Sequence, residues 1–317
     1  MILGTVEQFF LRHAVRDRRV CIALSGGVDS VVLLHAIRRL AVVLDLSVSA
    51  FHVHHGLSAN ADKWAGACES VCRALDVPLT VARVTVDRES PQGLEAAART
   101  ARYAALSAVG ADYLALAQHA DDQAETVLHQ MLRGTGLRGM AGMGESRRLR
   151  DGLALLRPLL TVTRAEIEVY AVENGLEWVE DESNADTAYT RNFLRHEIMP
   201  RLAQRFPHFR ESLARTARHA SEADEMLDAL AKIDLAWDGY QARADLLDAL
   251  PLIRQVNALY HWLQWLGPHP FPPPSHAELA EWAQQLFRQS PRNKPHVAGG
   301  HDFLIRRTKD QLVLQGK

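Results

Sequence analysis

The hexapeptide at positions 25–30 has the residue types that bind phosphate, and it reads SGGVDS. Its two consecutive glycines let the backbone turn sharply and bring N–H groups against an anion. A helix that begins near Val28 directs its positive end to the same place, and the hydroxyls of Ser25 and Ser30 add two donors. The segment therefore predicts a phosphate-binding turn.

Asp29 is the unexpected member of this turn, because a carboxylate repels a phosphate unless a cation lies between them. We expect Mg²⁺ to bridge Asp29 and the phosphates. The segment has neither the lysine of the G-x-x-x-x-G-K-[ST] loop nor the spacing of G-x-G-x-x-G. A plain Ser/Gly turn in which Asp29 caps a helix is the alternative.

A second group of titratable residues follows a later apolar run. Asp122 and Glu125 are three residues apart and share one face of a predicted helix, and His119 stands at the end of the preceding strand. Asp121 and Asp122 could instead be ordinary helix caps. Alternation along a strand puts His52 and His54 on one face, but no third ligand of fixed spacing accompanies them. His52, His54 and His55 therefore favour roles in a nucleotide pocket or in the core over a zinc site.

The elements that must position these residues alternate between strands and helices. Strands are expected at 20–24, 48–53, 79–84 and 113–117, and helices at 28–40, 61–75, 94–109 and 121–133. This alternation predicts an α/β fold: a Rossmann-like parallel sheet with helices on both faces. In such a sheet, ligands bind beyond the carboxyl ends of the strands.

The remainder of the chain has a different character. Five glycines within 133–144 predict a mobile loop, and a further α/β stretch with a helix at 163–174 follows it. Helices are expected at 209–230, 242–266 and 277–288, with a proline-rich break at 267–275 and a terminal hairpin that turns near Lys309-Asp310. We therefore expect one domain at 1–207 and a mainly helical accessory domain at 208–317.

Composition excludes several classes of protein. The 36 Lys and Arg residues against 38 Asp and Glu exclude a globally basic nucleic-acid binder, although a local patch is sufficient for binding. Three cysteines do not make a disulfide framework and favour a reducing compartment. Neither a membrane-spanning run nor a signal peptide is evident, so we expect a cytoplasmic protein with no membrane partner.

The turn at 25–30 resembles the PP-loop of the ATP pyrophosphatases, S-G-G-x-D-S. That family splits ATP between its α and β phosphates and leaves AMP on the substrate. Further segments, over about residues 18–205, are similar to tRNA(Ile)-lysidine synthetases. These segments are 52–57, 93–99, 102–103, 117–126, 133–136, 157–160, 181–184 and 191–195.

The resemblance implies that lysine is joined to C2 of the wobble cytidine in a CAU-anticodon isoleucine tRNA. The reaction would consume ATP and require Mg²⁺. Asp29, His119 and Asp122 would be catalytic, and Asp29 would hold the metal. The expected ATP contacts are Ser25, Gly26, Gly27, Val28, Asp29, Ser30, His52 and His55. The expected lysine or RNA contacts are Asp122, Glu125, Arg99, Arg102 and Arg133, with Arg138, Arg191 and Arg195 as further candidates for ATP phosphates or tRNA.

The chain departs from the family pattern at two positions. Leu57 is followed by Ser58 where arginine is common, and Gln118 stands where a second histidine is common. Longer members carry a further C-terminal domain, which this chain is expected to lack, and a homodimer is expected by analogy alone. The alternatives are a tRNA thiolase, an ammonia-dependent amide ligase and a non-catalytic nucleotide sensor. The three cysteines do not have a C-x-x-C spacing and speak against the thiolase.

Overall fold

The computed structural model describes residues 1–87, 89–90, 93–180, 190–239, 241–267, 274–287, 296–299, 303–308 and 310–316. The chain divides into two compact units, Met1–Arg218 and His219–Lys317. The division falls inside one long helix, α10 (Phe209–Asp234), which begins just after the domain boundary expected at residue 207.

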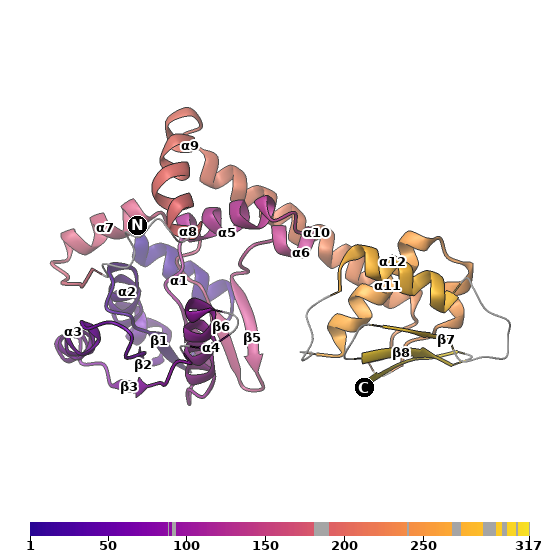
Figure 1. The fold of residues 1–317 in the computed structure, drawn as a ribbon. Coiled ribbons are helices and arrows are strands. Elements are labelled where there is room, and N and C mark those ends of the chain that lie inside the picture. The colour runs from indigo at the N-terminus through magenta and orange to yellow at the C-terminus, as the bar shows by residue number, and fades with distance from the viewer. Residues whose placement is uncertain are drawn as a thin grey trace. The chain divides into compact units, whose positions relative to one another are not determined.

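A six-stranded sheet organises the first unit (Figure 1). Its strands are β1 Arg18–Ala23, β2 Leu46–His54, β3 Leu79–Arg83, β4 Tyr113–Ala115, β5 Ser146–Arg150 and β6 Leu153–Leu156. They lie in the order β3-β2-β1-β4-β6-β5, and every neighbouring pair is parallel except β5 with β6. The strand order reverses between β1 and β4, and ligands bind at such a switch point.

Helices cover both faces of this sheet, which confirms the predicted fold class. They are α1 Ile2–Arg12, α2 Val28–Leu44, α3 Ala61–Ala74, α4 Leu94–Ser107 and α7 Arg164–Glu173. Residues of α1, α2, α3 and α7 share one buried cluster with Val20 and Ile22 of β1. Leu106 of α4 packs with Leu114 in a separate cluster on the other face.

Several elements of this unit differ from the sequence-based expectation. Helix α1 was not predicted, and the β5–β6 hairpin is antiparallel. The glycine-rich segment is not simply a loop, because it contains a helical turn, α6 (Leu137–Met140). Gly139 lies against the side chain of Thr135, which would have to move to accommodate a Cβ at that position.

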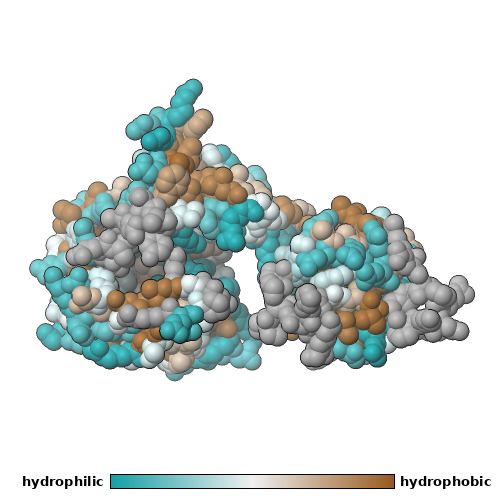
Figure 2. Space-filling model, in the orientation of Figure 1, coloured by the Kyte–Doolittle hydropathy of each residue, from teal (hydrophilic) through white to brown (hydrophobic). Residues whose placement is uncertain are grey.

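A group of helices follows the sheet in sequence and packs around α5 (Ala120–Leu132). It comprises α8 (Thr190–Phe193), a π-helical turn η2 (Leu194–Ile198), α9 (Met199–Arg205) and the start of α10. Ala124, Met199 and Phe209 form its buried centre. Hydrophobic surface is visible near α9 in Figure 2. Phe206, which follows α9 in the chain, is 58% exposed. The expected motif at 181–184 lies outside the described residues.

The second unit combines helices with a small sheet. After α10 come a 3-10 turn η3 (Asp245–Ala249), α11 (Leu252–Trp265) and α12 (His276–Phe287), and then the antiparallel strands β7 His296–Ala298, β8 Phe303–Arg307 and β9 Leu312–Gly316. Trp262, Trp282 and Ile305 belong to its core.

The expected hairpin of this unit is present, whereas one expected helix begins later than predicted. The terminal hairpin is confirmed, although Lys309 lies outside the described residues. The helix expected at 242–266 begins only at Leu252, because Pro251 precedes it as the N-cap and lacks the amide that an interior helical residue donates. Most of the proline-rich break and the expected end of the last helix at Arg288 also lie outside the described residues. No described helix is long and apolar enough to cross a membrane.

Candidate functional site

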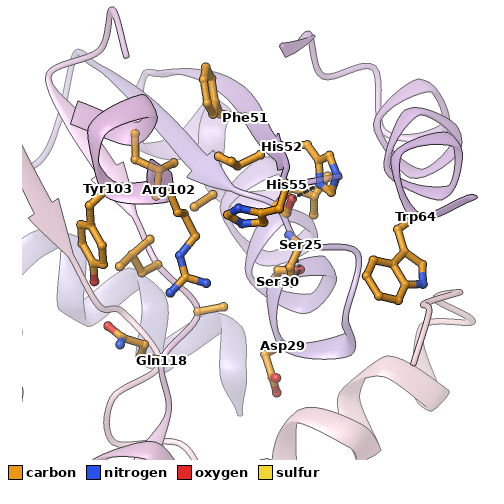
Figure 3. A pocket seen from close by; sticks show the side chains of 16 residues that line it. Ser25, Asp29, Ser30, Phe51, His52, His55, Trp64, Arg102, Tyr103 and Gln118 are labelled. Atoms are coloured by element: carbon orange, nitrogen blue, oxygen red, sulfur yellow. Dashed lines mark hydrogen bonds between the residues drawn. The ribbon is translucent and has the colours of Figure 1, made fainter. Parts of the chain in front are cut away.

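A cavity of about 360 Å³ opens beyond the carboxyl ends of β1, β2 and β4 (Figure 3). Trp64 of α3 lines it on one side, and Arg102 and Tyr103 of α4 line it on another. This is the switch point of the strand order, where an α/β sheet leaves space for a ligand. Of the residues expected to bind substrates, the cavity brings together Ser25, Asp29, Ser30, His52, His55 and Arg102.

The predicted phosphate-binding turn joins β1 to α2 as expected. Gly26 has a φ of +91°, and a Cβ there would lie 3.0 Å from Val179 Cγ2, so this position requires glycine. Gly27 is the N-cap of α2. Ser30 Oγ lies 3.1 Å from Ser25 Oγ and donates to Gly27 O at 2.9 Å, which fixes the turn. The amides of the first turn of α2 have no partner within the helix and are available to an anion.

Asp29 stands between the cavity and a group of charged residues. Its Oδ2 accepts a hydrogen bond from Arg164 Nη1 at 2.6 Å, and its Oδ1 lies 3.7 Å from His119 Nε2. Burial raises the pKa of Asp29, while the charges of His119 and Arg164 lower it. Oδ1 is buried and accepts no hydrogen bond from the described residues.

This free oxygen fits the expected metal. Mg²⁺ is usually held by one or two carboxylates together with substrate phosphates and water. Asp29 Oδ1 can supply the single carboxylate oxygen beside the phosphate-binding turn. The described residues contain no group of three or more His, Cys, Asp or Glu side chains that could hold a metal. The donor set is therefore compatible with Mg²⁺ shared with phosphates.

The acidic pair lies on α5, next to Asp29 but outside the lining of the cavity. Asp122 Oδ2 accepts a hydrogen bond from the His119 backbone and lies 3.4 Å from His119 Nε2. Asp122 thus takes part in the N-terminal cap of α5, as the alternative interpretation predicts. His119 Nε2 lies between the carboxylates of Asp122 and Asp29. Glu125 is only 2% exposed, and burial raises its pKa.

Two arginines that were candidates for contacts with ATP phosphates or tRNA lie against these carboxylates. Arg195 Nη2 lies 2.7 Å from both Asp122 Oδ1 and Glu125 Oε2. Arg191 Nη1 lies 3.6 Å from Glu125 Oε1. A cationic group therefore already occupies the place at which an ammonium group would meet the acidic pair.

Burial disfavours the charged form of the two cavity histidines, His52 and His55. His52 is buried with Nδ1 2.8 Å from Leu24 O, and His55 Nδ1 is buried without a hydrogen-bond partner among the described residues. Burial lowers the pKa of both. His54 turns elsewhere, toward Asp62 at 3.1 Å.

The remaining arginines lie either at the cavity or at the C-terminal end of α5. Arg102 lines the cavity, and Arg99 lies over the Tyr103 ring with its guanidinium carbon 5.1 Å from the ring centre. Arg133 is the exposed C-cap of α5 and is not among the lining residues. The site also contains Arg164, which the sequence analysis did not single out, because its contact with Asp29 joins positions far apart in the chain.

Comparison with known proteins assigns the family. Residues 4–202 match the PP-loop domain, and residues 243–313 match the TilS substrate binding domain. The tRNA(Ile)-lysidine synthase of Actinobacillus pleuropneumoniae serotype 3 is 38% identical over the whole chain, which covers 74% of that protein. The chain belongs to the tRNA(Ile)-lysidine synthase family. The recognition of this family from sequence motifs is therefore confirmed.

Two further relatives, both named tRNA(Ile)-lysidine synthase, are longer than this chain. The protein of Burkholderia pseudomallei is 50% identical over 85% of this chain, and that of Pseudomonas fluorescens is 50% identical over 77% of it. The chain spans 56% and 57% of the lengths of these two relatives. The U34-tRNA thiolase NcsA from Methanococcus maripaludis shares the fold, with a TM-score of 0.62 and 18% identity over 70% of this chain and 78% of that one.

Proposed function

We propose that the chain ligates free L-lysine to C2 of the wobble cytidine in a CAU-anticodon isoleucine tRNA, with conversion of ATP to AMP and pyrophosphate. The observation that carries this proposal is the contact of Asp29 with His119, which joins the phosphate-binding turn to the acidic pair. The proposed nucleotide site and the proposed site for a cationic amine would thus adjoin each other. Relatives of this chain are named tRNA(Ile)-lysidine synthase, which supports the same reaction.

The first step would adenylate the cytidine. Its C2 oxygen attacks the α-phosphorus of ATP, and the bond to the β-phosphate breaks so that pyrophosphate leaves. The amides at the start of α2, with Ser25 and Ser30, would stabilise the negative charge that develops on the phosphate. Mg²⁺ bound at Asp29 would neutralise phosphate charge during this step.

The second step would replace AMP by lysine. The side-chain amine attacks C2, and the bond from C2 to the adenylate oxygen breaks. Asp122 and Glu125 would bind the ammonium group, which must displace Arg195 from between them. The amine needs to lose a proton, because its ordinary pKa is about 10.4. His119 Nε2, 3.4 Å from Asp122 Oδ2, is placed to accept it.

The thiolase alternative loses support from the cysteines. Burial raises the pKa of Cys68 to about 12 and that of Cys72 to about 11. Both side chains are buried, as is Cys21. Sulfur transfer requires an accessible thiolate or a cluster ligand, and these thiols are neither.

The test is incorporation of labelled lysine into tRNA transcripts in the presence of Mg-ATP. We expect acid-precipitable label with the CAU-anticodon isoleucine tRNA and none with a methionine tRNA. Formation of AMP without lysine incorporation would contradict the proposal and indicate another tRNA-modifying or amide-forming PP-loop enzyme. Cytoplasmic location and a homodimer remain predictions.

A further inference from the structure

Arg157 is a buried cation whose partners are neutral. It follows β6 directly and is 6% exposed. Its Nε donates to Gln118 Oε1, and its Nη1 donates to Gly144 O at 2.7 Å. A buried guanidinium normally has a carboxylate partner, because neutral acceptors do not offset the cost of desolvating the charge. Arg157 therefore leaves positive charge available to an external anion.

The charged neighbours of Arg157 are cations as well. Burial lowers the pKa of Arg157 and Tyr103 raises it, while the charges of Arg147 and Arg99 lower it. The fold explains their proximity: Arg147 on β5 is paired with Leu155 on β6, so its side chain shares a face with Arg157 two residues later. Among the described side chains, none of the three arginines forms an ion pair with a carboxylate.

This arginine cluster, Arg99, Arg147 and Arg157, adjoins the cavity. Gln118, the acceptor for Arg157, lines the cavity, and so does Tyr103, the ring beneath Arg99 (Figure 3). The cluster comes from α4, β5 and the end of β6, whereas the phosphate-binding turn follows β1. A phosphate at the cluster is thus held by different elements from those that hold the nucleotide.

We propose that Arg99, Arg147 and Arg157 bind a phosphodiester of the RNA strand whose target base enters the cavity. This inference rests on the proposed function for the nature of the substrate. Arginine presents a planar set of donors that matches phosphate oxygens. A backbone phosphate held at the rim fixes the register of the strand without reading its sequence. The target base can then lie in the cavity beside the nucleotide.

The decisive experiment compares Arg147→Gln with Arg148→Gln. Both arginines are exposed and consecutive on β5, so each substitution removes one charge from the same strand. Their side chains point to opposite faces, and Arg148 forms an ion pair with Asp151. We would measure affinity for the isoleucine tRNA transcript without ATP over a range of salt concentrations, and affinity for Mg-ATP by calorimetry.

We expect Arg147→Gln to weaken tRNA binding about fivefold and to reduce the log–log salt slope by about 0.7–0.9, the contribution of one phosphate contact. Arg148→Gln should change the affinity less than about twofold, and Mg-ATP affinity should be unchanged in both. Equal effects of the two substitutions on tRNA binding would overturn the proposal. So would a loss of Mg-ATP affinity with tRNA binding intact, because the phosphate would then belong to the nucleotide.

Arg157 itself is tested with Arg157→Lys and Arg157→Met. Lysine keeps the charge but loses the planar donors, so tRNA affinity should fall in both variants and further in Arg157→Met. Wild-type tRNA affinity in a folded Arg157→Met protein would contradict the role of this residue. If Arg157→Met does not fold, the Arg147 and Arg148 pair still decides. Wild-type protein that binds tRNA but incorporates no lysine would contradict only the proposed function.

Discussion

At the scale of single residues, the site depends on charges whose partners are few and specific. Asp29 has one oxygen on Arg164 and one without a hydrogen-bond partner among the described residues, and Glu125 is buried against Arg195. Each of these carboxylates has its pKa raised by burial. Changing one member of such a set therefore alters both protonation and binding.

Removal of the Asp29 carboxylate tests its expected metal role. We expect Asp29→Ala to reduce pyrophosphate release at least about 100-fold, because the oxygen that would share Mg²⁺ with the phosphates is lost. Arg164→Gln keeps that oxygen and should retain more activity. The measurement is pyrophosphate release with tRNA present, and wild-type release from Asp29→Ala would exclude the metal role.

Removal of Arg195 should make stability depend on pH. Arg195→Met leaves the Glu125 carboxylate without its nearest cation, so the pKa of Glu125 rises further. A carboxylate whose pKa is higher in the folded than in the unfolded protein destabilises the fold as pH rises through the folded value. We expect a loss of about 1–3 kcal/mol near neutral pH and a smaller loss near pH 5, by chemical denaturation.

Two further variants control this experiment. Arg191→Met should have a smaller effect, since its Nη1 is 3.6 Å from Glu125. The double variant Arg195→Met with Glu125→Gln should recover stability near neutral pH, because no buried charge is left unpaired. A pH-independent loss in Arg195→Met would show that lost packing, rather than charge, is the cause.

At the scale of elements, the turn between β1 and α2 determines where phosphate can bind. Its two glycines have different reasons to be there. Gly26 has a positive φ and is crowded by Val179 and Cys68, whereas Gly27 has a φ of −71° and a Cβ there would lie 3.6 Å from Ser25 Oγ. Only the first position requires a residue without a side chain.

A matched pair of alanine substitutions follows from this difference. Gly26→Ala should destabilise the protein by about 1–3 kcal/mol and weaken Mg-ATP binding, because a left-handed backbone and a close contact must both be accommodated. Gly27→Ala should cost less than about 1 kcal/mol. Thermal unfolding and calorimetric titration with Mg-ATP measure both effects. Equal effects at the two positions would contradict the geometry of the turn.

At the scale of the whole molecule, charge is balanced overall and concentrated locally. The formal net charge is −2, yet arginines gather next to the cavity on α4 and β5. A protein of this kind attracts RNA through a patch rather than through its net charge. Matches to a PP-loop domain and to a substrate binding domain lie in separate parts of the chain.

Binding of tRNA should consequently depend steeply on salt. Each phosphate that an arginine or lysine neutralises contributes about 0.7–0.9 to the slope of log affinity against log salt concentration. We expect a slope that corresponds to several phosphates, measured by filter binding with the full chain. A flat response would show that phosphate contacts do not dominate the affinity.

The sequence alone determined the fold class, the family and some of the positions that line the cavity, among them Ser25, Asp29 and His52. Local sequence pattern is sufficient for these predictions. The periodicity of apolar residues distinguishes strands from helices. A Ser/Gly turn with a carboxylate, placed between a strand and a helix, indicates a phosphate-binding turn. The antiparallel β5–β6 hairpin and the helical turn at Leu137–Met140 were not predicted, because glycine and arginine content does not reveal what packs against them.

Only the tertiary structure decided which charges meet. Arg195 lies on the acidic pair, Arg164 lies on Asp29, and Arg157 is buried with neutral partners. The residues in these contacts lie between 13 and 135 positions apart in the chain. A charged side chain carries no local signal of its partner, because ion pairing depends on the distance between folded elements and on burial from water.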